Sequence, residues 1–428
     1  MRRILFSFII SIIASISGIA DAFAGDARLQ ASLITCYPGP EVYELCGHEA
    51  IRIRGIDADG IPVDSVWNYG VFDFASPNFI YRFCKGETDY MVMGYPFAWF
   101  LPQYVERGSK VVEQDLNLSP EQTLTLRRLL QVNSLPANRT YRYNYVRDNC
   151  STRVANLIDS AVAPATIIYP DSVSYASFRD AMRHFHRNYP WYQLGIDLAL
   201  GAGIDMPITA REEMFAPVLL EEKVEQARFA DGTPLVKYQT VLNEGGDATL
   251  PPTPFWLSPL FFSLLILAFS IAVAVREWKK SRIVRWWMTA FFSLLGILGC
   301  VVWFLVFISS HDSTSPNLLF LWLNPLQLVL AICIWWRHTR PAAMAMAICN
   351  IIILIVLIGA WPLQPQSANT AVFPLWGATL ILSAVYAIIY PKDSLYIEER
   401  SEKLPVRRRS AGTPSTPRRR PSRNRKLK

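Results

Sequence analysis

"YNYVRDNCSTRVANLI" (residues 143–158) decides how the fold of this chain is interpreted, because it places a cysteine where a turn becomes a helix. Asp148 and Asn149 are both favourable N-cap residues. The apolar residues that keep step with Cys150, at offsets of 4, 7, 8 and 11, are Val154, Leu157, Ile158 and Ala161. These offsets trace one helical face. We therefore expect Cys150 to point inward from the first turn of an amphipathic helix.

Three roles are open to Cys150. A helix N-terminus lowers the pKa of a thiol, and its free N–H groups can hold a developing oxyanion. Cys150 is thus a candidate nucleophile, with the backbone amides of Cys150 and Ser151 as oxyanion donors. It can also be a core residue or half of a disulfide. The segment up to residue 250 holds four cysteines, at 36, 46, 84 and 150, and an even count in an oxidising compartment favours two disulfides.

The chain opens with a secretory signal sequence. Residues 2–3 are arginines, residues 4–16 are almost entirely apolar, and residues 22–24 (AFA) form a small-x-small cleavage site. We expect residues 1–24 to be a signal peptide and residues 25–250 to be exported, with an uncleaved anchor as the alternative.

The second half of the chain has the composition of a membrane domain. Five apolar runs follow a polar Gly/Pro linker, "NEGGDATLPPTP" (243–254). The predicted spans lie near 255–275, 286–309, 317–336, 341–361 and 370–390. Each is long enough to cross ~30 Å of hydrocarbon as a helix. We therefore expect an all-α domain of five transmembrane helices over 255–390.

Loop charges predict the orientation of these spans. The loops 276–285 and 337–340 are basic, whereas 309–317 and 364–369 contain no Lys or Arg. Basic loops stay in the cytoplasm. We therefore expect a multi-pass protein of the inner membrane, with residues 25–250 in the periplasm and the C-terminus in the cytoplasm.

The basic tail accounts for the positive net charge. The chain carries +7, and the segment 401–428 alone holds eleven Lys or Arg and one Glu. Residues 400–428 are rich in Arg, Pro and Ser and are predicted to be disordered. Beside a membrane such a tail fixes topology or touches anionic headgroups, so no nucleic-acid partner is expected.

The exported segment has the pattern of an α+β domain. Predicted strands are "ASLITCYPG" (31–39), "HEAIRIRG" (48–55), "DSVWNYGVFDF" (64–74) and "YMVMGYP" (90–96). "LSPEQTLTLRRLL" (118–130) is a predicted helix in which Ser119 and Gln122 form a capping box. Residues 172–226 are mainly helical in pattern. A small antiparallel sheet with helices packed on it is the expected architecture.

A thiol nucleophile needs a base, and the chain has histidines at 48, 184, 186, 311 and 338 only. His338 lies in a predicted cytoplasmic loop, and the helix around 184–186 is polar and expected to be exposed. His48, which follows a glycine at the start of a strand, is the leading candidate base. Asn68 or Asp73, in the next strand, is the candidate orienting residue. A purely structural role for all three residues is the alternative.

Two motifs in this order resemble a known fold. "GHEAIRI" (47–53), followed about 100 residues later by "YVRDNCSTR" (145–153), is similar to the permuted papain-like fold. In that fold the histidine strand precedes the cysteine helix, which reverses the order of ordinary papain and NlpC/P60 proteins. Lecithin:retinol acyltransferase shares this permuted order and has an Asn-Cys pair at its helix start.

The chain resembles the Lnb lipoprotein N-acyltransferase family over residues 30 to 390, approximately. The similar stretches are "TCYPGPEVYELCGHEAIRI" (35–53), "NYGVFDF" (68–74), "DNCSTR" (148–153) and "SPNLLFLWLNPL" (315–326). The resemblance implies an enzyme of the bilayer whose acyl donor is a membrane phospholipid. The acceptor would be the α-amine of the N-terminal diacylglyceryl-cysteine of a diacylated lipoprotein. It also implies Cys150 as nucleophile and His48 as base.

Polar residues near the predicted third span are candidates for contact with substrate headgroups. His311 and Asn317 lie in or beside a predicted periplasmic loop, and Asn324 lies just inside the span. An amide inside an apolar span is costly unless it is paired, so Asn324 is expected to make a structural or substrate contact. Ordinary polar loop residues are the alternative for His311.

Three other functions stay open. A cell-wall peptidase or amidase would use the same Cys/His pair but has no need of a membrane bundle. A phospholipid hydrolase would differ only in letting water open the acyl-enzyme. A membrane-anchored binding or scaffold protein would hold Cys150 in a disulfide. No P-loop, dinucleotide fingerprint or metal-ligand cluster occurs in the sequence, so no cofactor or metal is expected.

Overall fold

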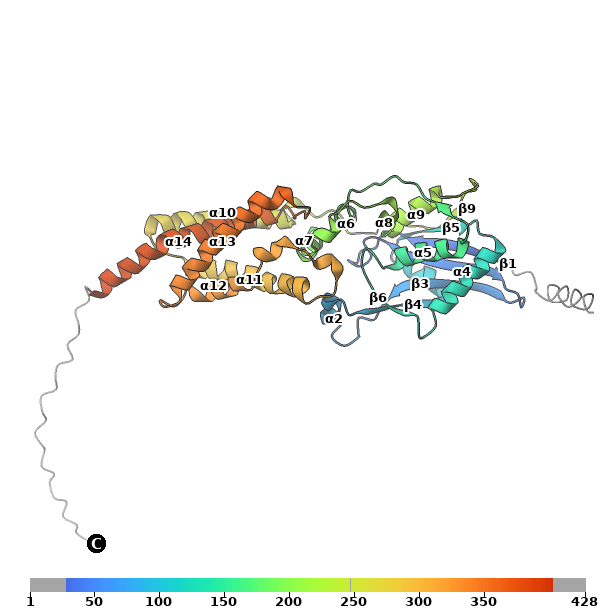
Figure 1. The fold of residues 1–428 in the computed structure, drawn as a ribbon, viewed down its shortest axis with the longest axis horizontal. Helices are drawn as coiled ribbons and strands as arrows, with labels where there is room; N and C mark the ends of the chain where they lie inside the picture. The colour runs from blue at the N-terminus through green and yellow to red at the C-terminus, as the bar shows by residue number, and fades with distance from the viewer. Residues whose placement is uncertain (1–27, 247, 403–428) are drawn as a thin grey trace, which may run out of the picture.

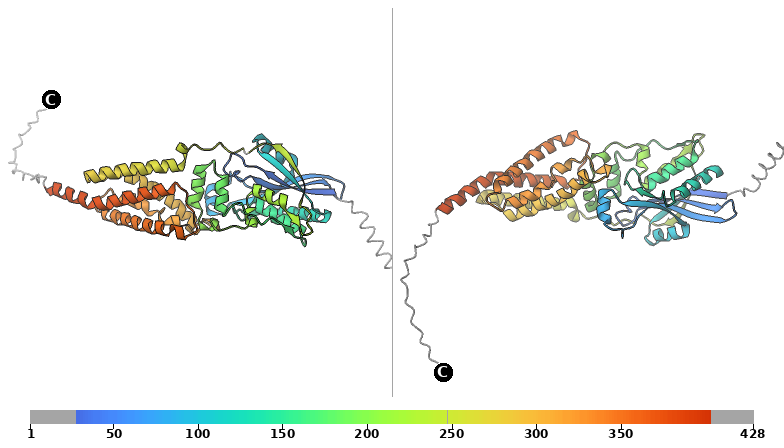
Figure 2. Two further views of the ribbon diagram at one scale, coloured as in Figure 1. Left: turned by 90° about the horizontal axis from the view of Figure 1, so that it is seen from above. Right: turned by 60° about the horizontal axis from the view of Figure 1, so that its bottom comes forward.

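The computed structural model describes residues 28–246 and 248–402. An α+β part and a bundle of long helices lie end to end (Figure 1), and both further views show the same arrangement (Figure 2). The predicted signal peptide and the basic tail beyond residue 402 lie outside the described residues.

The α+β part is built on one antiparallel sheet of seven strands in the order β6-β4-β3-β2-β1-β5-β9. Its strands are β1 (Arg28–Cys36), β2 (His48–Ile56), β3 (Pro62–Val71), β4 (Asp89–Pro96), β5 (Lys110–Leu116), β6 (Thr140–Arg142) and β9 (Val236–Glu244). A small second sheet pairs β7 (Ile167–Ile168) with β8 (Arg228–Phe229). The predicted α+β class and its four strands are confirmed. The sequence did not predict β5 or β9, and β9 is an edge strand whose side chains are largely exposed.

Helices cover both faces of this sheet. They are α2 (Phe79–Lys85), α3 (Phe97–Glu106), α4 (Pro120–Asn133), α5 (Cys150–Val162), α6 (Phe178–Phe185), α7 (Pro190–Ala199), the 3-10 turn η1 (Ala202–Ile204), α8 (Ala210–Glu213) and α9 (Pro217–Gln226). Side chains of α4, α5 and α9 form one core with β1, β2 and β3, and α3 packs on the opposite face. The predicted capping box of α4, Ser119 with Gln122, is present.

The register of β1 and β2 fixes the face that receives α5. Leu33 pairs with Ile51 and Ala31 pairs with Ile53, and all four side chains are fully buried beneath the helices. The predicted apolar face of α5 packs against them in the same core. Alternate residues of β2, beginning with His48, therefore belong to the other face of the sheet.

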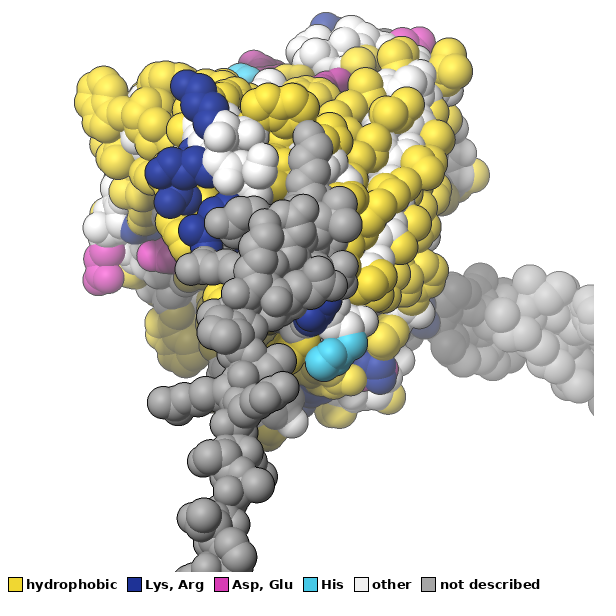
Figure 3. All heavy atoms as spheres, turned by 90° about the vertical axis from the view of Figure 1, so that its left-hand side faces the viewer, with side chains coloured by type: hydrophobic (Ala, Val, Ile, Leu, Met, Phe, Trp, Pro, Cys, Tyr) yellow, Lys and Arg dark blue, Asp and Glu magenta, His cyan; other side chains and the backbone are white. Residues whose placement is uncertain are grey.

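The bundle begins with the 3-10 turn η2 (Phe255–Leu257). The helices and turns that follow are α10 (Pro259–Lys280), α11 (Arg285–Phe307), η3 (Asp312–Thr314), η4 (Leu318–Leu321), α12 (Leu326–Cys333), α13 (Arg340–Ala360), η5 (Trp361–Leu363) and α14 (Val372–Glu402). Among the described residues, four helices are long and apolar enough to cross a membrane. Seen from the end away from the sheet, Lys and Arg side chains gather at the tip of the bundle and hydrophobic side chains cover its flanks (Figure 3).

The predicted third span is not one continuous helix: of the five expected spans, four are continuous helices in the described residues, and the count of five stays a prediction. Over 318–333 the chain forms η4 and then the short helix α12. Pro325 cannot donate a backbone hydrogen bond, so the helix restarts after it. Asn324 caps the break, because Leu326 N–H donates to Asn324 Oδ1 (3.1 Å) and Asn324 Nδ2 donates to Leu321 O (2.8 Å).

The broken segment nevertheless runs alongside α11 in the opposite direction. Trp303 Nε1 donates to Phe320 O (3.0 Å), and further along the segment Trp335 Nε1 donates to Thr289 Oγ1 (2.7 Å). The break can approach α11 closely because α11 has a glycine there. A Cβ at Gly299 would lie 2.5 Å from the backbone nitrogen of Asn324.

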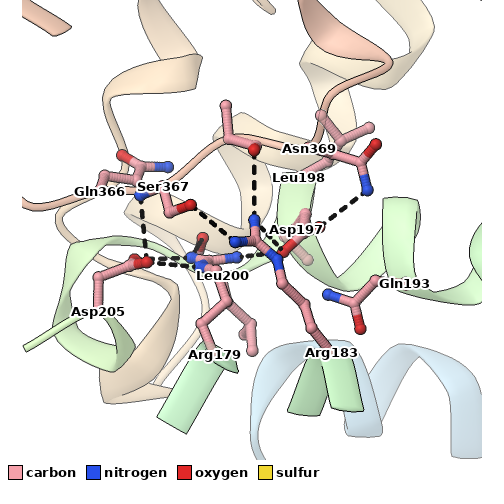
Figure 4. A network of polar contacts seen from close by, with 12 residues as sticks. Arg179, Arg183, Gln193, Asp197, Leu198, Leu200, Asp205, Gln366, Ser367 and Asn369 are labelled. Carbon is pink, nitrogen blue, oxygen red and sulfur yellow. Dashed lines mark hydrogen bonds and ion pairs between the residues drawn. The ribbon is translucent and has the colours of Figure 1, made fainter. Parts of the chain in front are cut away.

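A buried ion network joins the α+β part to the bundle (Figure 4). Arg179 of α6 is fully buried and donates to Asp197 Oδ1 (2.8 Å), Asp205 Oδ1 (2.8 Å) and the carbonyl oxygens of Leu200 and Gly201 (2.8 and 3.1 Å). The guanidinium is thus hydrogen-bonded on every side, as a buried charge requires.

The same carboxylates also bind the loop between α13 and α14. Asn369 Nδ2 donates to Asp197 Oδ2 (2.9 Å), and Ser367 N–H donates to Asp205 Oδ1 (3.1 Å). Arg183 adds a bond to Ser367 Oγ (2.8 Å). Two arginines and two aspartates balance in charge at this junction. Their hydrogen bonds link the α+β part to the bundle and so contribute to its orientation.

We expect Arg179→Met to unfold this junction, because it leaves the carboxylates of Asp197 and Asp205 buried with fewer partners. Breaking a buried ion pair costs roughly 3–5 kcal/mol. The matched control is Arg211→Met, whose ion pair with Asp159 is more than one-third exposed on both sides. An exposed pair is worth about 0–1 kcal/mol. Differential scanning fluorimetry of the purified variants should show a marked fall in Tm for Arg179→Met alone, and equal Tm values would contradict the role given to the network.

Candidate active site

Cys150 is the first residue of α5, and its position is fixed by the residue before it. Asn149 Oδ1 accepts from the N–H groups of Ser151 (2.9 Å) and Thr152 (3.0 Å), and Thr152 Oγ1 accepts from Asn149 N–H (2.8 Å). The other end of the Asn149 amide donates to the carbonyl oxygens of Tyr145 (2.7 Å) and Phe215 (2.9 Å). All of the hydrogen-bonding capacity of this side chain is used, so the start of the helix is rigid.

The thiol of Cys150 is buried beside backbone N–H groups. Burial raises the pKa of Cys150 to about 12, and the charge of Glu49 acts in the same direction. The backbone N–H groups of Glu49, Ser151 and Cys150 itself face the sulfur and oppose that rise in pKa. The resting side chain is therefore a neutral thiol with N–H donors already in place for negative charge.

These donors include both backbone amides of the predicted oxyanion site, whose catalytic role stays a prediction. The Ser151 N–H also donates to Asn149 Oδ1. The Glu49 N–H is a third donor, which was not predicted from the sequence. Pairing of β2 with β3 begins at Ala50–Asn68, one residue beyond Glu49, and the pairing of β3 with β4 shifts register between Asn68 and Val71. No sequence pattern identifies this donor, since it depends on where two strands part.

His48 lies next to Glu49 as the first residue of β2. It pairs with Cys36 of β1 and follows Gly47, whose φ of 83° is the left-handed conformation that favours glycine. A Cβ at Gly47 would lie 2.6 Å from the Cys36 carbonyl oxygen. The tight turn before His48 thus requires glycine and sets where the imidazole begins.

Asn68 orients the imidazole. His48 Nε2 lies 2.5 Å from Asn68 Oδ1, and Asn68 Nδ2 donates to the hydroxyl of Tyr95 (2.9 Å). With Asn68 Nδ2 directed to Tyr95, Asn68 Oδ1 faces the ring, and because an amide oxygen only accepts, Nε2 carries the proton. Nδ1 is left with its lone pair free to accept a proton. Tyr104 stacks on the ring at 6.3 Å between centroids.

His48 is half-buried, and this burial lowers its pKa to about 4 although the Asn68 contact opposes the shift. No hydrogen bond joins the imidazole to the Cys150 sulfur within residues 28–246 and 248–402. The backbone N–H of Glu49, the residue after His48, faces the sulfur. The pair rests as neutral thiol and neutral imidazole, and proton transfer is left to the moment of attack.

Asp73 is not brought to His48. Its carboxylate accepts from Ala75 N–H (2.8 Å) in an exposed turn beyond β3. Of the two predicted orienting residues, only Asn68 contacts the imidazole.

The three polar residues predicted near the third span make structural contacts. His311 Nε2 lies 2.8 Å from the carbonyl oxygen of Phe83 at the end of α2. Asn317 is buried and donates to Leu198 O (2.9 Å). Asn324 caps the broken span, as described above. A headgroup contact by any of them stays a prediction.

The expected exposure of the helix near 184–186 is wrong for His186. This side chain is fully buried, with Nδ1 2.8 Å from Gln193 Oε1 and Nε2 3.2 Å from the hydroxyl of Tyr145. The polar sequence of α6 gave no sign of this burial. His186 is the C-cap of α6 and packs against the α7 segment. That hydroxyl also lies 3.3 Å from Cys46 Sγ.

All seven cysteines are free thiols, so the two disulfides favoured by the even count are not formed. Cys36 is buried at the end of β1, whereas Cys84 lies on α2, next to the bundle. The alternative of a membrane-anchored scaffold protein requires Cys150 in a disulfide, and Cys150 is a free thiol.

Comparison with known families agrees with this architecture. Residues 23–177 match the Lnb N-terminal periplasmic domain, and residues 252–393 match the Lnb transmembrane domain. Together these matches cover more than half of the chain.

The chain belongs to the Lnb family.

Neither a curated protein nor a solved structure matches the chain. Membership of the Lnb family makes this a multi-pass membrane protein with a periplasmic N-terminal domain. The periplasmic match spans both His48 and Cys150, so the candidate dyad lies wholly within that Lnb domain.

We expect Asn68→Ala to impair acyl transfer from an activated ester such as a p-nitrophenyl acyl ester, because the imidazole loses its fixed tautomer. Loss of an orienting residue lowers kcat/KM by roughly tenfold or more. The matched control is Asp73→Ala in the neighbouring turn, which should change kcat/KM by less than about twofold. Equal effects of the two changes would show that Asn68 does not orient the base.

The pH dependence of the same reaction should report the lowered pKa of His48. Only neutral imidazole can accept the thiol proton, so kcat/KM should stay level down to about pH 5 and fall below about pH 4. The same shift makes the folded state less stable as pH falls below 6.5, since the unfolded chain then binds more protons. Thermal unfolding measured at each pH separates the two effects. An acidic limb near pH 6.5 in folded protein would contradict the assignment.

Proposed function

We propose that this Lnb-family protein is a lipoprotein N-acyltransferase that works through a thioester on Cys150. The acyl donor is a membrane phospholipid, and the acceptor is the free α-amine of a lipoprotein's N-terminal diacylglyceryl-cysteine. The observation that carries the proposal is a free, buried thiol at the start of α5, in the same domain as a His48–Asn68 pair, with that domain docked on a membrane bundle.

The first step forms the acyl-enzyme. His48 Nδ1 takes the thiol proton while the sulfur attacks the ester carbonyl of the phospholipid. The N–H groups of Cys150 and Glu49, which face the sulfur, would donate to the developing oxyanion. Collapse of the intermediate breaks the ester C–O bond, and His48 returns its proton to the lysophospholipid hydroxyl. The fatty acyl group is left as a thioester on Cys150.

The second step forms the amide. The α-amine of the acceptor attacks the thioester carbonyl and gives up a proton to His48, and the C–S bond breaks. The thiol recovers that proton, so the cycle needs no outside reactant. Cys150 is only 7% exposed, which limits access of water to the thioester.

The arrangement supports a permuted papain-like fold. The histidine strand β2 precedes the cysteine helix α5 in the chain, and Asn68 on the adjacent strand orients the histidine. Docking on the bundle supports lipid substrates over a cell-wall peptide, because Arg179, Asp197 and Asp205 hold the domain against the membrane helices. With the domain in the periplasm, the C-terminus would lie in the cytoplasm.

The test is mass spectrometry of lipoprotein N-terminal peptides from a host that lacks any other N-acyltransferase. The host carries the intact protein, Cys150→Ala, or the matched control Cys349→Ala, whose thiol is exposed on α13. We expect a third, amide-linked acyl chain with the intact protein and the control, and a free amine with Cys150→Ala at equal membrane abundance.

Each other outcome has a defined meaning. Acylation by Cys150→Ala would overturn the thiol nucleophile. A free amine in every strain would overturn the lipoprotein acceptor. In that case, fatty acid released in a Cys150-dependent reaction would identify a phospholipid hydrolase, and cleaved peptidoglycan would identify a peptidase.

A further inference from the structure

The short helix α2 is fastened to the periplasmic end of α11. Its last carbonyl oxygens are all engaged by the loop that follows α11: Cys84 O accepts from Ser309 Oγ (2.7 Å), and Lys85 O accepts from Ser310 N–H (2.9 Å). His311 adds its ring contact to the next carbonyl toward the helix start. A segment that is distant in sequence is therefore held at the point where a membrane span ends.

The outward side of α2 is apolar. Ile80 is 70% exposed and Tyr81 is 54% exposed. Tyr81 also packs on Phe304 of α11, with 5.9 Å between ring centroids. Beside it, Phe307 and Ile308 at the end of α11 are 59% and 57% exposed. Large apolar side chains at this level are costly in water and favourable in the outer part of a bilayer.

A series of aromatic rings leads from α2 toward the thiol. We call Phe72, Phe74, Phe79, Tyr90 and Tyr143 the aromatic cluster. Ring centroids lie 5.8 Å apart for Phe79 and Phe72, 5.0 Å for Phe72 and Tyr90, and 4.3 Å for Tyr90 and Tyr143. On the α2 side, Phe79 is followed by Phe83 at 6.2 Å. Each ring thus contacts the next.

The last ring of the cluster lies beside Cys150. Tyr143 and Cys150 both flank Gly70, where β3 turns away from β2. A Cβ at Gly70 would lie 3.8 Å from Tyr143 Cε2 and 4.0 Å from Cys150 Cβ. A series of ring contacts, with Phe79 and Tyr90 buried within it, therefore extends from the end of a membrane span to the candidate nucleophile.

We propose that α2 and the aromatic cluster form the path by which one acyl chain of a phospholipid leaves the periplasmic leaflet and reaches Cys150. This inference rests on the phospholipid donor proposed above. Aromatic and apolar side chains would shield the chain from water along the path, and α2 would lie in the leaflet at its entrance.

The position of α2 favours lipid over a protein partner. Tyr81 packs on the last turns of α11, so the apolar side of α2 continues the lipid-facing surface of the bundle. The charged groups next to α2 are paired with one another, as in Arg82 with Asp89 (3.1 Å) and Lys85 with Glu87 (2.7 Å). The remaining outward side chains of α2 are apolar, which suits contact with acyl chains.

The direct test is photo-crosslinking in vesicles. The full-length Cys150→Ala protein, which cannot turn over, is reconstituted with a phospholipid that carries a diazirine at the end of one acyl chain. Peptide mapping after illumination should show lipid on residues 72–83 as well as on the spans. The β2–β3 turn, residues 57–61, should stay unlabelled. Labelled spans without label on 72–83 would overturn the path.

A kinetic test uses Ile80→Glu in otherwise intact protein. Placing a charge where an Ile side chain meets hydrocarbon should raise KM for vesicle phospholipid by about tenfold, while kcat changes by less than about twofold. The matched control is Ile61→Glu, since Ile61 is 57% exposed in the β2–β3 turn. Equal KM values in the two variants would count against α2 as the entrance.

The two proposals can fail separately. If the intact protein acylates lipoproteins but 72–83 is unlabelled, the path is wrong and the function stands. If 72–83 is labelled but no lipoprotein is acylated, the path stands and the acceptor is wrong. The crosslinking result does not depend on Ile80→Glu being able to fold.

Discussion

The buried guanidinium of Arg179 is the centre of the ion network that holds the α+β part on the bundle. It lies among Asp197, Asp205 and two carbonyl oxygens, and the same carboxylates bind the loop between α13 and α14. Burying charges gains little net stability, because desolvation offsets most of the attraction. What such a network does supply is geometry, since each group has one set of partners that satisfies it. The domain and the bundle are thereby held in one orientation.

That orientation gives the thiol its chemical setting. The α2 helix rests on the end of α11, the aromatic cluster extends from α2 to Tyr143, and Cys150 lies beside Tyr143 behind Gly70. A buried thiol with a pKa of about 12 and an imidazole with a pKa of about 4 do not form an ion pair at rest. Neutral groups cost less to desolvate than a thiolate and an imidazolium, which is compatible with the hydrocarbon chain of the proposed acyl donor.

Chain order and strand register contribute differently to the dyad. The order, with His48 before Cys150, is visible in the sequence and carried the resemblance to a permuted papain-like fold. The choice between Asn68 and Asp73 was not visible. Asn68 pairs with Ala50, two residues along β2 from His48, and so reaches the ring, whereas Asp73 lies past the irregularity in β3. Glu49 lies one residue beyond the last β2–β3 pair, and its N–H faces the sulfur.

Local patterns determined much of this protein by themselves. Helical periodicity and N-cap chemistry predicted the helix that starts at Cys150. Alternation predicted strands β1 to β4, and the length of the apolar runs predicted the four continuous spans. These signals could be interpreted because each acts over a few neighbouring residues. Local rules failed where distant segments decide the outcome. Asn324 and Pro325 break the third apolar run, and Gly299 of α11 makes room for that break. His186 is buried under a following helix, and the cysteines of an even-numbered set stay apart as thiols. The tertiary structure decided these points, because each depends on which group a residue meets across the fold.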